Sequence, residues 1–342
     1  MKYIAGAFLI AALILSACET PRDTPDGPIP EGDGVYILNE GNYLAGNGSL
    51  SFYSFQTSAI YNDLFTVRND RPLGDIPTYM ATDGEKGFLI VNNSGTIEVV
   101  DLKTIETLGT VTGLSSPRQM VIRGRKGYIS SLLSDLITVL DLDNLTVTGT
   151  IDIGSSSEAM IIYGNRLFAA NWAGGSRIAV VDLADNTVES EINTGMEPES
   201  MVLDKNGRLW VLCTGGYMNE EIPSILKINA STLSVEAEMK FRTNSDNPSS
   251  LTINRGGDTL YYIDEGVRRM PVSMTSLPGE ALIVAGGRLF YRLAVSPVNG
   301  MIVVTDAIDY QQKGDLLVYN RKGILIDTEQ AGIIPGFMRF NN

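Results

Sequence analysis

The chain has 342 residues, with 40 acidic and 26 basic side chains, a formal net charge of −14 and no histidine. An acidic surface without a compensating cluster of Lys or Arg repels phosphate backbones, so nucleic acid is excluded as a partner. The lack of histidine removes the commonest general base, the commonest metal ligand and every Ser-His or Cys-His nucleophile pair.

The N-terminus has the features of a secretory targeting segment. Lys2 precedes an apolar stretch from Ile4 to Leu15, which is too short to span a bilayer comfortably. The stretch leads into Ser16-Ala17-Cys18, which resembles the lipobox of bacterial lipoproteins, in which the cysteine becomes the lipidated first residue. We therefore expect residues 1–17 to be a signal peptide, Cys18 to carry the lipid, and residues 18–33, rich in proline and acidic residues, to form a flexible tether.

A short phrase, Pro-x-x-Met or a variant of it, recurs seven times in the remaining chain. The copies are Pro77–Met80, Pro117–Met120, Ser157–Met160, Pro198–Met201, Pro248–Leu251, Phe290–Leu293 and Pro335–Met338. Their last residues are spaced by 40, 40, 41, 50, 42 and 45 positions. A period of about 40 residues built of short strands is typical of a β-propeller. We interpret the phrase as the start of the innermost strand of each blade.

Three further strands are predicted after each phrase. In the second unit they are Gly87–Asn92, Thr96–Asp101 and Glu106–Val111, where β-branched and aromatic residues lie between turn residues. The sixth unit is irregular, with its last strand expected at Ala281–Val284. Asp141-Leu-Asp143 is typical of turn capping by an aspartate, which we favour over a metal site.

The two ends of the chain complete each other. Val35–Asn39, Leu50–Phe55 and Ala59–Phe65 match the second, third and fourth strands of a unit that lacks its first strand. The final segment, residues 335–340, supplies that strand. The sequence therefore predicts an all-β fold over residues 34–342, a seven-bladed propeller of four-stranded blades in which the C-terminal strand closes the ring and removes open sheet edges.

The loops before the inner strands and between the second and third strands are expected to share one face with the mouth of a central channel. Their candidate ligand-binding residues are Tyr43, Tyr79, Arg118, Glu158, Trp172, Glu199, Tyr217, Tyr291, Arg292 and Tyr310. Large amphipathic rings beside a few charges suit a bulky, partly polar ligand or a protein partner. The alternative is that the aromatic residues only plug the channel. The two residues inside each phrase vary while the frame repeats, so we expect function there.

No catalytic or metal-binding constellation stands out. The carboxylates are scattered through turns, no acid–base pair is evident, and no cofactor is required. Cys213 lies in the apolar run from Leu209 and is interpreted as a buried strand thiol.

Several spaced sequence phrases in the chain, taken together, resemble those of a known family. Repeats such as Ile178-Ala-Val-Val-Asp-Leu183, preceded by Pro-x-x-Met, look like YVTN- or YncE-type seven-bladed propellers. Tyr36–Asn42, Leu73–Asp75 and Ser116–Arg118 are similar to lipid-anchored surface propellers of gut Bacteroidetes, as are Glu197–Glu199 and Gly332–Pro335. That family includes BtuG-like lipoproteins, which capture cobalamin and hand it to a TonB-dependent outer-membrane transporter.

The resemblance implies a binding protein rather than an enzyme. It implies an outer-membrane, surface-exposed lipoprotein, held to the membrane by its lipid anchor alone, that captures cobalamin or a related corrinoid and passes it to a TonB-dependent transporter. A propeller that scaffolds an envelope complex without a small ligand is the alternative. A propeller lyase or lactonase would need a base or metal site that the sequence does not provide.

Overall fold

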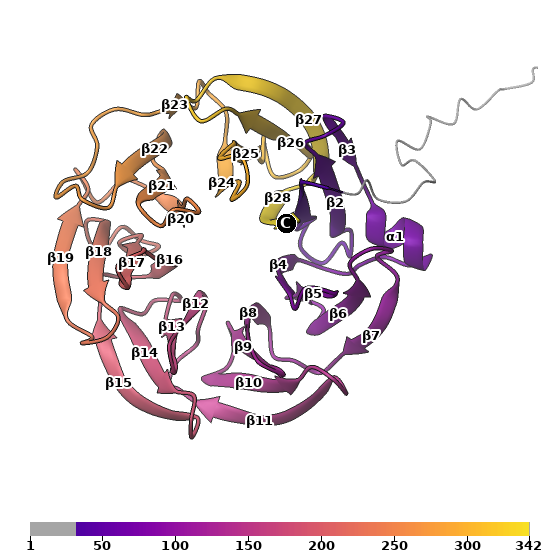
Figure 1. Cartoon of the computed structure of the whole chain (residues 1–342), viewed down its shortest axis with the longest axis horizontal. Coiled ribbons are helices and arrows are strands. Elements are labelled where there is room, and N and C mark those ends of the chain that lie inside the picture. The colour runs from indigo at the N-terminus through magenta and orange to yellow at the C-terminus, as the bar shows by residue number, and fades with distance from the viewer. Residues whose placement is uncertain (1–31, 342) are drawn as a thin grey trace, which may run out of the picture.

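The computed structural model describes residues 32–341, so the expected signal peptide, Cys18 and most of the expected tether lie outside the described residues. Seven four-stranded antiparallel sheets stand as blades around a central opening (Figure 1). The prediction of an all-β, seven-bladed propeller is confirmed. Within this described range, no helix is both long and apolar enough to cross a membrane.

The blades are numbered from the N-terminus and their strands run from the channel outward. Blade 1 contains β28 (Pro335–Asn341), β1 (Gly34–Asn39), β2 (Ser49–Ser54) and β3 (Ala59–Tyr61). Blade 2 contains β4 (Pro77–Thr82), β5 (Lys86–Val91), β6 (Thr96–Asp101) and β7 (Thr107–Val111). Blade 3 contains β8 (Pro117–Arg123), β9 (Lys126–Ser131), β10 (Leu136–Asp141) and β11 (Thr146–Asp152). Blade 4 contains β12 (Met160–Tyr163), β13 (Arg166–Ala170), β14 (Arg177–Asp182) and β15 (Thr187–Asn193).

The last three blades follow the same order. Blade 5 contains β16 (Pro198–Leu203), β17 (Arg208–Cys213), β18 (Ser224–Asn229) and β19 (Val235–Lys240). Blade 6 contains β20 (Ser249–Ile253), β21 (Thr259–Ile263), β22 (Gly266–Pro271) and β23 (Ile283–Val284). Blade 7 contains β24 (Phe290–Val295), β25 (Ile302–Asp306), β26 (Lys313–Tyr319) and β27 (Leu325–Ile333). The predicted strand at Ala281–Val284 is thus present only as its last two residues.

The ring closes as predicted. β28 pairs antiparallel with β1, with Val35 opposite Phe340 and Ile37 opposite Met338. Figure 1 shows β28, at the C-terminal end of the colour range, on the channel side of the N-terminal strands β1 to β3. One sheet therefore joins both ends of the described chain, and its hydrogen bonds hold the ring shut.

The predicted strand Ala59–Phe65 is wrong in its second half. β3 ends at Tyr61, and α1 (Leu64–Asn69) follows a left-handed residue, Asp63. Leu64 and Phe65 are both buried in the apolar cluster between blades 1 and 2. Adjacent residues of a strand point to opposite faces, whereas a helical turn can bury two neighbours on one side. The Asn69 side chain then donates hydrogen bonds to the carbonyls of Phe65 and Ile105 at 2.9 Å each, which fixes the helix on the neighbouring blade.

The apolar core lies between the blades rather than within them. Seven clusters of buried side chains each join two adjacent blades, and the one formed by Val35, Val318 and their neighbours joins blade 7 to blade 1. The methionine of the repeated phrase belongs to these clusters. Met120 packs on Gly127 so closely that a Cβ there would overlap its methyl group, which explains the glycine at this point of the second strand.

Aspartate side chains cap the polar turns, as the sequence predicts, and Cys213 is buried. The Asp141 carboxylate accepts hydrogen bonds from the backbone N–H groups of Asp143 and Asn144 at 3.0 and 3.1 Å, so it caps the turn. Cys213 is a buried strand thiol, and burial raises its pKa to about 12. Both sequence interpretations are confirmed.

Candidate functional site

In six of the seven blades, all but blade 4, the two variable residues of the repeated phrase lie at a β-bulge. The register of the inner strand against its neighbour shifts between Pro77 and Tyr79, and equivalent shifts occur in blades 1, 3, 5, 6 and 7. In a regular strand, two adjacent side chains would face opposite sides. A bulge re-aims them, so both members of a pair can reach the channel.

The pairs surround a cavity of about 260 Å³ at the mouth of the channel. Every residue of the seven pairs except Ser249 and Tyr291 lines it. The cavity's charged side chains are Glu40, Arg118, Glu158, Glu199 and Arg292. Members of all seven pairs therefore lie together around one cavity, and the mouth carries three acidic and two basic groups.

Arg118 and Glu158, from adjacent blades 3 and 4, form a closed ion pair. Arg118 Nε lies 2.6 Å from Glu158 Oε2, and Nη2 lies 2.7 Å from Oε1, so the contact is bidentate. The side chains are only 16% and 21% exposed. Burial opposes the charged guanidinium, but Glu158 outweighs it and raises the pKa of Arg118 above its usual value. This pair ties the two blades together at the channel.

Arg292, from blade 7, is held more loosely. Its Nη1 lies 3.8 Å from Glu199 Oε1 and donates a 3.3 Å hydrogen bond to the carbonyl of Tyr291. The guanidinium lies over the Tyr291 ring at 4.4 Å. Burial opposes its charge, yet Tyr291, Glu199 and the other mouth carboxylates keep the pKa of Arg292 raised. The side chain is 33% exposed, so it presents a permanent cation to the cavity.

Glu40 is a mouth residue that the sequence reasoning missed. It follows β1 rather than a repeated phrase, and its Oε1 accepts a 2.8 Å hydrogen bond from the Tyr291 hydroxyl. Burial, the largest cause, and the nearby Glu40 carboxylate raise the pKa of Tyr291. The feature of the sequence that relates to the position of Glu40 is Gly336. A Cβ at residue 336 would lie 2.6 Å from Glu40 Oε1, so the glycine leaves the space that Glu40 fills.

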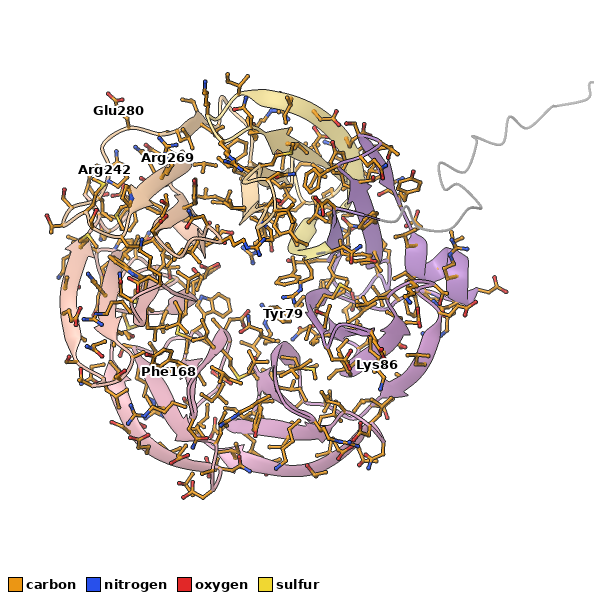
Figure 2. The ribbon with its side chains drawn as sticks, in the orientation of Figure 1. Tyr79, Lys86, Phe168, Arg242, Arg269 and Glu280 are labelled. Atoms are coloured by element: carbon orange, nitrogen blue, oxygen red, sulfur yellow. The ribbon has the colours of Figure 1, made fainter. Side chains whose placement is uncertain are left out.

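Two aromatic rings form one wall of the cavity. Tyr79 and Phe337 lie with ring centroids 4.2 Å apart, and both line the mouth. Figure 2 shows Tyr79 at the edge of the central opening, whereas the labelled Arg242, Arg269 and Glu280 lie at the periphery of the ring. Burial raises the pKa of Tyr79. This wall offers an apolar surface beside the charged groups.

Some members of the variable pairs join the blades instead of facing a ligand alone. Ser200 accepts a 3.0 Å hydrogen bond from Leu251 N, and Ser250 accepts a 2.9 Å bond from Leu293 N. Gln119 accepts the equivalent bond from Met160 N. These residues of the variable pairs therefore also connect one inner strand to the next.

The predicted loop aromatics do not all meet at the mouth. Tyr310 packs edge-on against Tyr291 at 5.7 Å, and its carbonyl accepts a 2.9 Å hydrogen bond from Asn42 Nδ2. Tyr43 and Tyr217 stand on outer loops and are 70% and 88% exposed, and Trp172 is half-buried on the blade 4 loop. Leu44, Leu133 and Met218 are exposed on the same set of loops. The loops of blades 1, 3 and 5 therefore carry exposed aromatic and apolar side chains that do not line the cavity.

The arrangement is suited to binding. In residues 32–341, no group of three or more carboxylate or thiol side chains is placed to hold a metal ion. Glu158 is paired with Arg118, and Glu40 accepts a hydrogen bond from the Tyr291 hydroxyl. Fixed donors, fixed acceptors and an aromatic wall can orient a ligand without transferring a proton.

These features define a seven-bladed β-propeller with a mixed polar and aromatic cavity at one end of its channel. The sequence matches the family described as "Domain of unknown function (DUF5074)" over residues 33–328, and the chain belongs to that family. No curated protein matches it significantly.

Solved propellers share the fold at low identity. A quinonprotein alcohol dehydrogenase-like protein from Bacteroides thetaiotaomicron is 17% identical, with a TM-score of 0.71 over 90% of this chain and 78% of that one. A Lactobacillus plantarum protein is 13% identical, with a TM-score of 0.69 over 91% and 99% of the two chains. The periplasmic gluconolactonase of Pseudomonas aeruginosa is also 13% identical, with a TM-score of 0.67 over 90% and 99%. At these identities the likeness concerns the fold alone.

Proposed function

We propose that this protein is a surface-anchored binding lipoprotein that captures a bulky nutrient, cobalamin or a related corrinoid, and passes it to a TonB-dependent outer-membrane transporter. One observation carries the proposal: loops of blades 1, 3 and 5 carry the exposed side chains of Tyr43, Leu133 and Tyr217, and the channel holds a cavity lined by fixed polar groups. A broad ligand with an apolar body and polar edges matches such a surface.

The mode of capture follows from the rigidity of the mouth. The pairs stand on strands hydrogen-bonded on both sides, and bonds such as Leu293 N to Ser250 join neighbouring blades. A preformed site loses little conformational entropy on binding. The lipid on Cys18 would keep the ring at the outer membrane, and residues 18–33 would let it reach a transporter.

Isothermal titration of the full-length protein, purified in detergent, with cyanocobalamin and with cobinamide tests the ligand. We expect heat and a rise in melting temperature with at least one of the two. No heat and no thermal shift with either ligand would overturn the corrinoid assignment. Co-purification of a TonB-dependent transporter after cross-linking tests the partner.

A second function is a scaffold propeller that binds only protein. The observation in its favour is the exposure of Leu44, Leu133 and Met218, which are apolar side chains without a polar end to orient a small molecule. A stable protein partner together with a blank corrinoid titration would favour it.

The fold of the gluconolactonase raises an enzyme as a third possibility. We infer that the protein is not an enzyme, because the mouth hydroxyls of Ser200 and Ser250 are engaged by backbone N–H groups of the next blade rather than by Glu199. Hydrolysis of glucono-1,5-lactone above the buffer rate, with loss of that rate in both Arg118→Ala and Glu199→Gln, would contradict this inference.

A further inference from the structure

Arg292 and Glu199 place a hydrogen-bond donor and an acceptor side by side on the wall of the cavity. Their closest atoms, Nη1 and Oε1, are 3.8 Å apart, which is too far for a direct hydrogen bond. The oxygen and nitrogen of a planar amide are about 2.2 Å apart, from the standard C=O and C–N bond lengths. With hydrogen bonds of about 2.9 Å, an amide edge facing the pair reaches Nη1 with its oxygen and Oε1 with its nitrogen.

Both partners have hydrogen-bonding capacity left over. Within residues 32–341, the Arg292 side chain makes one hydrogen bond, from Nη1 to the Tyr291 carbonyl, so its Nε and Nη2 donors are unused. Glu199 Oε2 accepts a 3.1 Å bond from Ser250 N, while in the same described part of the chain Oε1 accepts none. Arg118 differs, because Glu158 engages its Nε and Nη2 together. A ligand can therefore bind at Arg292 and Glu199 without breaking an existing ion pair.

The charges of the mouth select against ions. Three carboxylates and two guanidiniums line the cavity, so the mouth has one excess negative charge. An anionic group reaching Arg292 would also meet Glu199 and Glu40, and a cationic group reaching Glu199 would meet Arg292. A neutral group that both donates and accepts satisfies the two residues at once.

We propose that Arg292 and Glu199 form a subsite for a primary carboxamide of the ligand. This proposal rests on the capture function proposed above, and it names the chemical group of the ligand that the mouth recognises. Corrinoids carry several primary carboxamides around the edge of their macrocycle. Tyr79 and Phe337 line the same cavity and offer an apolar wall to the body of the ligand.

The test compares cyanocobalamin with its monocarboxylic acids, in each of which one peripheral amide has been hydrolysed. By isothermal titration, the wild-type protein should bind at least one acid about tenfold more weakly, because a site built for an N–H donor rejects an analogue that lacks it. Glu199→Gln should reduce that difference to less than about twofold, and Arg292→Ala should weaken cyanocobalamin itself about tenfold. Equal affinity for all acids, or discrimination that persists in Glu199→Gln, would overturn the proposal.

A matched control uses the same substitution at a closed pair away from the cavity. Arg166 and Glu189 form a bidentate pair in blade 4 and do not line the mouth. Glu189→Gln should leave the discrimination between amide and acid unchanged. A loss of discrimination in this variant as well would show that the effect is not local, and the subsite assignment would fail.

Small probes separate this proposal from the corrinoid assignment. If cyanocobalamin gives no heat, that assignment fails, and saturation-transfer NMR with nicotinamide, nicotinate and glucose still tests the subsite. Nicotinamide should give a signal that is lost in Arg292→Ala. A signal from nicotinate or glucose alone, a nicotinamide signal that survives in Arg292→Ala, or silence with all three probes would overturn the carboxamide subsite.

Discussion

The two sides of the channel mouth use the same residue types to different ends. Arg118 and Glu158 come from adjacent blades and meet at 2.6 Å, whereas Arg292 and Glu199 come from blades 7 and 5 and stop 3.8 Å apart. Blade 6 separates the second pair and contributes only Ser249 and Ser250 at this level. Neighbouring inner strands are close enough for long side chains to pair, and a blade with small residues between them leaves a gap. The first pair therefore ties two adjacent blades together, whereas no direct hydrogen bond joins the second.

The largest effect on stability is expected from Arg118→Ala. It leaves Glu158 mostly buried without its partner, and we expect the free energy of unfolding to fall by about 2–3 kcal/mol, less than for a fully buried pair because both side chains retain some solvent contact. Urea unfolding followed by tryptophan fluorescence measures the change. Arg292→Ala should cost less than about 0.5 kcal/mol. Equal losses in the two variants would erase the distinction between the closed and the open pair.

Ser250→Ala should have the next largest effect. It removes the acceptor of Leu293 N, which is a buried hydrogen bond between blades 6 and 7. An unpaired buried N–H costs about 1–2 kcal/mol, and we expect the same urea assay to show that loss. Ser249, which does not line the cavity, provides the control. A Ser249→Ala variant as unstable as Ser250→Ala would contradict a role specific to this bond.

Double-mutant cycles give a sharper comparison of the two pairs. Alanine substitutions at Arg118 and Glu158, singly and together, should yield a coupling energy of about 1–2 kcal/mol. The same cycle at Arg292 and Glu199 should yield less than about 0.5 kcal/mol, because no direct hydrogen bond joins the two side chains. A larger coupling at Arg292 and Glu199 would mean that the pair is closed in solution.

The smallest expected effect concerns alkaline pH. The folded state raises the pKa of Tyr291, so its protonated form is favoured by folding, and that stability is lost as pH rises above the ordinary tyrosine pKa of about 10. Tyr291→Phe should therefore lose less stability than the wild type between pH 9 and pH 11. Urea midpoints at the two pH values provide the measurement, and an unchanged alkaline loss would assign the effect to the other buried tyrosines.

The ring could be predicted because the spacing of the repeated phrases can be measured directly along the sequence. Seven phrases about 40 residues apart gave the blades, and the missing first strand before Val35 gave the closure with residues 335–340. Leu64 and Phe65 were assigned to a strand because their apolar character fits either element, but in the structure a helix buries both in the cluster between blades 1 and 2.

The mouth could be predicted only in outline. Arg118 and Arg292 both lie inside a repeated phrase, and only the identity of the neighbouring blades determines which one finds a partner. Glu40 lies outside every phrase, and its position depends on the absent side chain of Gly336. Gln119 and Ser250 look like functional variation in the sequence, yet their backbone partners lie more than 40 residues away.

The sheet that joins β28 to β1 also sets an order of events during synthesis. β1, β2 and β3 emerge early, yet their blade stays incomplete until residues 335–341 arrive after the other six blades. Until then β1 has an unpaired edge, and the apolar cluster between blades 7 and 1 is unfinished. A chain that ends before β28 thus exposes the edge of β1 and the unfinished apolar cluster. Both surfaces are covered only when the whole propeller has been made.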